Sequence, residues 1–75
     1  MNETLMRRKL NAYIETSVIN VEERKETIMK HLRERIGDGD FDGAYMYYRQ
    51  CITCNDSIKQ LNEFKSFLLN EQNGD

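Results

Sequence analysis

The apolar residues of this chain recur at helical spacing and divide it into three segments. The first segment places apolar residues four, seven, eight and twelve positions apart, as on one face of a helix: Met6, Leu10, Tyr13, Ile14 and Val18. We therefore expect a first helix from about residue 3 to residue 17.

A second helix is expected to begin at Asn20. An asparagine side chain can accept a hydrogen bond from a backbone amide, and Glu23, three residues later, can reach back to complete a capping box. Gly37 is expected to supply the left-handed turn that commonly ends a helix. The inward face of this helix would consist of Val21, Ile28, Leu32 and Ile36.

The third segment begins near Phe41 and carries two apolar stripes. The first consists of Phe41, Ala44, Tyr45, Tyr48, Cys51 and Ile52, and the second of Ile58, Leu61, Phe64 and Leu68. Between them lie poor helix formers, and Ser57 with Gln60 can form a new capping box that would give two helices. Because no glycine or proline interrupts residues 44–73, one helix of about 28 residues, with an overhang that needs a partner, is favoured.

These segments predict an all-α fold, a small bundle of three helices whose third helix is long, with a break near residues 55–57 left open. Residues 1–70 would form a single helical domain, and the polar residues 71–75 a frayed tail. Chains of 75 residues bury only about 60% of their unfolded surface, so self-association would help to stabilise the fold. We expect a homodimer.

The charge pattern argues against nucleic acid and membrane as partners. The net charge is −2, and acids and bases alternate within Glu22–Glu26 and Arg33–Arg35, which is typical of a solvated helix face. No run of about 20 apolar residues exists to cross a membrane, and the amino terminus lacks an apolar signal core. A cytoplasmic location follows as an expectation.

The run Asp38-Gly39-Asp40-Phe41-Asp42-Gly43 has two interpretations. It resembles the first half of an EF-hand calcium loop, which implies Asp38, Asp40 and Asp42 as ligands. Met46 and Arg49 stand at the ninth and twelfth loop positions, however, and Arg49 brings a cation where the family has a bidentate glutamate. The favoured interpretation is an acidic turn in which Asp40 or Asp42 caps the next helix.

A second resemblance covers the same region. The stretch Gly39 to Ala44, followed by Tyr47-Tyr48 and Cys51-Ile52, is similar to the second helix of a tetratricopeptide repeat. The preceding residues depart from that family, since Leu32 stands in place of a glycine and Arg35 in place of an aromatic residue. The resemblance, which covers about 14 residues, implies a helix pair that binds a peptide or a protein.

No catalytic residues and no cofactor are expected. Cys51 and Cys54 form a C-x-x-C, but zinc sites need four ligands and His31 is the only histidine, so both cysteines are interpreted as small, reduced core or interface residues. A redox C-x-x-C would open a helix after a strand, and no strand pattern precedes this one. Nothing arranges an acid, a base and a nucleophile around His31.

The leading functional prediction is a non-enzymatic protein–protein interaction module: a small adaptor, inhibitor or regulatory subunit that binds a partner protein through a helix face. Within Tyr45-Met46-Tyr47-Tyr48, we expect Tyr45 and Tyr48 to face the core and Met46 and Tyr47 to face outward. The predicted protein-binding residues are Met46, Tyr47, Phe64, Phe67 and Leu68. The alternatives are a calcium-responsive protein and a self-assembling homodimeric scaffold.

Overall fold

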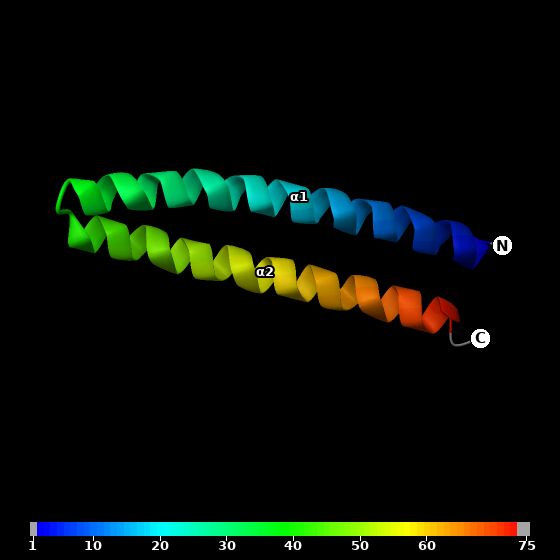
Figure 1. Ribbon diagram of the computed structural model, residues 1–75. Helices are drawn as coiled ribbons and strands as arrows, with labels where there is room; N and C mark the ends of the chain where they lie inside the picture. Colours follow the sequence, from blue (N-terminus) through cyan, green and yellow to red (C-terminus); the bar gives the residue numbers. More distant parts are fainter. Residues whose placement is uncertain (1, 74–75) are drawn as a thin grey trace.

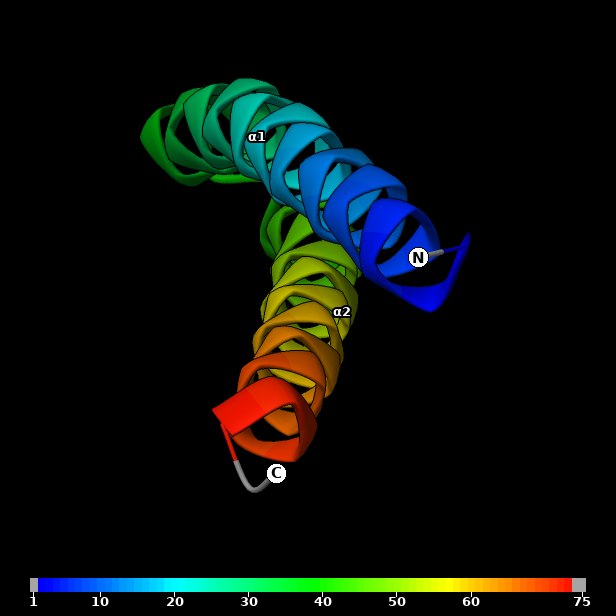
Figure 2. The same ribbon diagram turned by 90° about the vertical axis from the view of Figure 1, so that its right-hand side faces the viewer.

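The computed structural model describes the backbone of residues 2–73 and the side chains of residues 2–69. These residues form two long helices, α1 (Asn2–Gly37) and α2 (Phe41–Asn73), joined by a short turn. The helices lie side by side and antiparallel in a rod of 56 × 17 × 12 Å, with the turn at one end and both termini at the other (Figure 1). Figure 2, which looks onto the terminal end, shows the two helices inclined to one another.

The prediction of three helices is wrong because the first two predicted helices are one continuous helix. No glycine or proline lies between Asn2 and Ile36, and an asparagine inside a helix costs less than about 0.7 kcal/mol relative to alanine. Asn20 is therefore an exposed residue in the middle of α1 and not its cap. The continuous helix favoured across residues 55–57 is confirmed, and α1 is long enough to cover it. Its predicted overhang is therefore also wrong.

Residues 38–40 form the turn between the helices. Gly37 still has helical geometry, and the left-handed residue is Gly39, with φ of 76°, so the prediction that Gly37 supplies that conformation is wrong. The amides of Asp38 and Asp40 donate to the carbonyls of Glu34 and Arg35 at 3.0 and 2.9 Å, which satisfies the end of α1. The predicted frayed tail at 71–75 overlaps α2 as far as Asn73, and residues 74 and 75 lie outside the described part.

The two helices meet along a seam whose residues alternate three and four positions apart, which is the spacing of an antiparallel coiled coil. Every seam residue is buried or half-buried. Polar side chains interrupt the seam at four places, Arg7, Asn11, Lys25 and Lys65. The apolar seam residues are Ile14, Val18, Val21, Ile28 and Leu32 in α1, and Ala44, Tyr47, Cys51, Cys54, Ile58, Leu61 and Leu68 in α2.

The core within this seam is thin. Ile28, Cys51 and Cys54 form a buried cluster, against which Val21 and Tyr47 pack, so the interpretation of both cysteines as small core residues is confirmed. The molecule exposes 6067 Å², whereas a compact monomer of its mass exposes about 4,800 Å². Two helices have no third element to cover their flanks, and large apolar side chains consequently remain in solvent.

Candidate protein-binding surface

The five residues predicted to bind a protein do not lie on one surface. Leu68 is only 8% exposed and belongs to the seam. Tyr47 is half-buried, packs against the core and stacks on His31 with ring centroids 5.4 Å apart. Met46, Phe64 and Phe67 are exposed. Met46 lies 21 residues before Phe67, about 30 Å away along α2, so the two cannot form one small site.

The expected orientation of the tyrosine cluster is reversed in the structure. Tyr47 faces the seam, whereas Tyr45 and Tyr48 are exposed. The seam spacing explains this reversal, because Ala44, Tyr47 and Cys51 repeat every three and four residues and turn Tyr45 and Tyr48 onto the flank. The stripe predicted from Phe41 to Ile52 therefore mixes buried seam residues with exposed flank residues.

At the terminal end, exposed apolar side chains of both helices gather on one flank of the seam. The phenyl rings of Phe64 and Phe67 stack with centroids 6.3 Å apart. Phe64 and Phe67 each directly precede a seam residue of α2, and Met6, Leu10 and Tyr13 each directly precede a seam residue of α1. In two antiparallel helices these positions lie on the same flank of the seam. We call this set the terminal face: Met6, Leu10, Tyr13, Phe64 and Phe67, all exposed.

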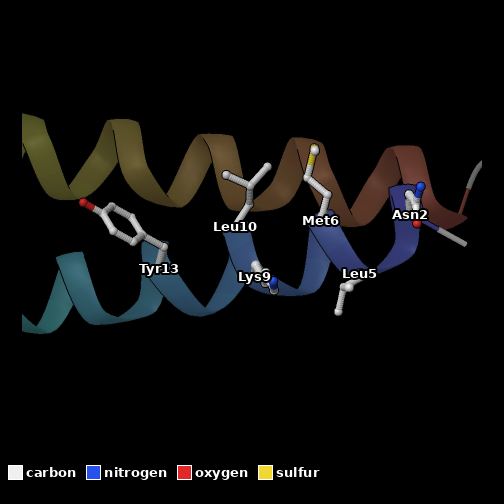
Figure 3. A pocket seen from close by; sticks show the side chains of 6 residues that line it. All are labelled: Asn2, Leu5, Met6, Lys9, Leu10 and Tyr13. Carbon is white, nitrogen blue, oxygen red and sulfur yellow. The ribbon is translucent and has the colours of Figure 1, made fainter.

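The α1 side of the terminal face contains a groove. Its volume is about 530 Å³, and its lining is mainly apolar: Asn2, Leu5, Met6, Lys9, Leu10 and Tyr13. Figure 3 shows the side chains of Met6 and Leu10 pointing to the same side of α1 and that of Leu5 pointing away from them. Tyr13 is 74% exposed, so its ring stands in solvent beside the groove. Lys9 contributes the one ionised side chain of the lining.

A second cluster of exposed apolar side chains lies near the turn, on the opposite flank of the seam. The Glu15–Lys65 ion pair marks this flank. Met29 and Ile36 follow Glu15 on α1 by whole multiples of seven residues, so all three occupy the same heptad position and lie on the same flank. On α2, Asn62 lies beside Glu15 and Lys65. Tyr48 and Phe41 precede Asn62 by whole multiples of seven residues, so they also lie on this flank. We call this set the turn face: Met29, Ile36, Phe41, Tyr45, Tyr48 and Ile52, all exposed.

The pattern of the seam would have revealed both faces from the sequence. Helical spacing alone groups every apolar residue within a broad stripe, so Met6, Leu10 and Tyr13 are counted with buried Ile14. The alternation of three and four residues separates them, but only when Arg7, Asn11, Lys25 and Lys65 are accepted as seam residues. Because charged residues are rarely placed in a core, that alternation is easily missed.

Two polar seam residues tie the helices together near the termini. The Arg7 guanidinium donates to the Leu68 carbonyl at 3.3 Å and to the Glu3 carboxylate at 2.8 Å. The Lys65 ammonium donates to the Glu15 carboxylate at 2.9 Å. The Arg7–Leu68 and Lys65–Glu15 contacts link the two helices, whereas the Arg7–Glu3 contact lies within α1. The charged groups of these contacts keep part of their surface in water.

The acidic turn is organised as a helix cap. The Asp40 carboxylate accepts a hydrogen bond from the Gly43 amide at 3.0 Å, which confirms Asp40 as the cap, and its other oxygen lies 3.7 Å from the Arg35 guanidinium. Asp38 lies after α1, and Asp42 lies in the first turn of α2. Among the described residues, no group of three or more acidic, histidine or cysteine side chains is placed to hold a metal ion.

Comparisons with known proteins add no identification, since no protein-family model, curated protein or solved structure matches the chain. Within the described residues, no helix combines the length and the hydrophobicity that crossing a bilayer requires. The surface itself therefore carries the functional argument.

Proposed function

We propose that this protein is a non-enzymatic interaction module, a small cytoplasmic adaptor, inhibitor or regulatory subunit that binds a partner protein through the terminal face. The observation that carries the proposal is the stacked pair Phe64 and Phe67 beside the apolar groove of α1, both open to solvent. Aromatic residues and methionine are enriched at protein interfaces, because they offer large contact areas with adaptable ends.

The shape and chemistry of the groove favour one kind of partner element. An amphipathic helix that presents apolar side chains three and four positions apart would place them between Met6, Leu10 and Tyr13. An acidic side chain on the rim of that helix would meet Lys9. The mechanism is occlusion or bridging: the hairpin covers a surface of the partner or links the partner to another protein.

Affinity capture with face-specific variants tests the proposal. The tagged chain is compared with Phe67→Asp and Tyr13→Asp, which place a charge on the terminal face, and with Tyr48→Asp, which makes the matched change on the turn face. Circular dichroism first confirms that each variant is folded. We expect one protein to be captured by the unchanged chain and by Tyr48→Asp, and lost from both terminal-face variants.

The captured protein is then purified, and its affinity for each variant is measured by calorimetry. Loss of a central aromatic anchor weakens binding by about 2 kcal/mol or more, which is roughly thirtyfold in Kd. Equal affinities for the unchanged chain and for Phe67→Asp and Tyr13→Asp would refute the proposed surface.

A further inference from the structure

We propose that the turn face binds a second copy of this chain, with the two α2 helices packed antiparallel around a two-fold axis between Tyr45 and Tyr48. The proposal concerns the flank and the end opposite to the terminal face, so it does not depend on the function proposed above. Its starting point is the α2 part of the turn face, where Phe41, Tyr45, Tyr48 and Ile52 repeat at spacings of four, three and four residues. A regular apolar stripe of this kind is the pattern by which helices pair.

The apolar part of this flank has sharp limits. Continuing the same spacing along α2 beyond Ile52 leads to four polar residues, Asn55, Lys59, Asn62 and Ser66, before it reaches the exposed Leu69. On α1 the corresponding steps from Met29 toward the amino terminus lead to Glu22 and Glu15. A second copy can therefore dehydrate a continuous apolar surface only near the turn. Farther along the rod the exposed Ile19 and Leu69 are isolated among polar groups, which an association along the whole rod would also bury.

The area of the turn face fits a stable dimer. The exposed fractions of its six side chains, at about 200 to 250 Å² for each complete residue, give on the order of 700 Å². Each partner of a specific protein complex contributes about 800 Å², and homodimer interfaces are more apolar than average. Phe41, which is 74% exposed, contributes the largest aromatic surface near the turn.

Two-fold symmetry pairs the stripe with itself in a definite way. An axis between residues 46 and 47 places Tyr45 of one copy against Tyr48 of the other, and Phe41 against Ile52. Each large aromatic residue then meets another aromatic ring or a branched aliphatic side chain. Such pairs contribute packing energy beyond their buried area.

The charges beside the stripe favour this antiparallel arrangement. Asp42 and Arg49 lie one heptad apart on the outer edge of the stripe, so the same axis brings each Asp42 near the Arg49 of the other copy. A parallel arrangement would instead place Asp42 near Asp42 and Arg49 near Arg49. Opposite charges across a rim select the orientation of a complex more than they raise its affinity.

Sedimentation equilibrium of the full chain tests the association. We expect a monomer–dimer equilibrium, and we expect Tyr45→Glu to raise its Kd roughly a hundredfold, because the change occurs twice in each dimer. Tyr13→Glu, the matched change on the terminal face, should leave the Kd unchanged. Circular dichroism establishes that both variants keep their helices. A chain that stays monomeric up to about 0.5 mM, or a dimer unaffected by Tyr45→Glu, would overturn the proposal.

A charge-exchange cycle tests the orientation. Asp42→Arg alone and Arg49→Asp alone each convert two attractive pairs into repulsions, and each should raise the dimer Kd roughly tenfold. The double variant restores opposite charges across the axis and should return the Kd to within about threefold of the original value. If the changes in dimerisation free energy of the two single variants simply add in the double variant, the antiparallel arrangement is overturned.

Small-angle scattering gives an independent measure of the geometry. With the axis near residue 46, each α2 extends about 40 Å from the axis to its carboxyl end, and the two copies extend in opposite directions. The dimer should therefore be about 80 Å long, against 56 Å for one chain. A dimer whose length stays near that of the monomer would mean that the two copies overlap along the whole rod, and would contradict the proposal.

Discussion

The Lys65 ammonium lies 2.9 Å from the Glu15 carboxylate, although the two residues are 50 positions apart in the chain. The pair marks how far one helix is shifted along the other. The stacking of His31 on Tyr47 and the packing of Ile28 on Cys51 follow the same register nearer the turn. One set of contacts therefore runs through the whole length of the hairpin.

The contribution of this pair to stability should be modest. Both side chains keep part of their surface in water, so solvent screens the attraction, and we expect a coupling free energy of about 0.2 to 1 kcal/mol. A double-mutant cycle of Glu15→Ala and Lys65→Ala, followed by urea unfolding, measures it. Coupling above about 2 kcal/mol would show that the pair is more deeply buried than described.

Asn20 distinguishes one long helix from two. In the middle of α1, replacement by alanine should stabilise the protein by about 0.5 kcal/mol, because alanine has the higher helix propensity. At a helix cap the same change would cost about 1 kcal/mol. The urea midpoint of Asn20→Ala therefore rises if Asn20 lies inside one helix and falls if Asn20 caps a second helix. A fall would contradict the continuous helix.

The sequence predicts the all-helical class, the long carboxy-terminal helix and the Asp40 cap, because helical spacing and capping chemistry are local. It does not predict the number of helices. The capping box at Asn20 is a local signal of about 1 kcal/mol, and the seam that continues through Val18 and Val21 outweighs it. The orientation of Tyr45 and Tyr48 depends on the partner helix, which local spacing cannot specify.

Ile28 holds the centre of the thin core. It packs against Cys51 and Cys54, so Ile28→Ala should lower the free energy of unfolding by about 2 to 4 kcal/mol. Ile19 is the matched control, since it is exposed on the same helix and its change to alanine should cost less than about 0.5 kcal/mol. Chemical unfolding measures both, and similar values for the two variants would contradict the assigned core.

Gly43 and Asp40 should be strongly coupled. A β-carbon at residue 43 would collide with the Asp40 carboxylate, which accepts the hydrogen bond from the Gly43 amide. Gly43→Ala should therefore lose most of the gain of about 1 kcal/mol that alanine brings to a helix. In an Asp40→Ala background the same change should stabilise by the full amount. Equal effects in both backgrounds would show that the cap is not formed.

Gly39 is the one described residue with positive φ, at 76°. Gly39→Ala should destabilise the hairpin by about 1 to 2 kcal/mol, because a side chain strains this left-handed conformation. Gly37 provides the control, since it is helical and has open space around it, and its change to alanine should be neutral or stabilising. Thermal unfolding of both variants measures the difference in their stability. Equal stabilities would mean that the turn is arranged differently.

The central claim is that α1 and α2 of a single chain pack against each other, and nuclear Overhauser spectroscopy on a diluted sample tests it most directly. Isotope-labelled chain is mixed with a large excess of unlabelled chain, so that labelled protons detect one another only within a molecule. The account predicts undiminished cross-peaks from the Ile28 methyl groups to the Tyr47 ring and to the β-protons of Cys51. Cross-peaks that vanish on dilution would place the two helices in different chains and contradict the hairpin.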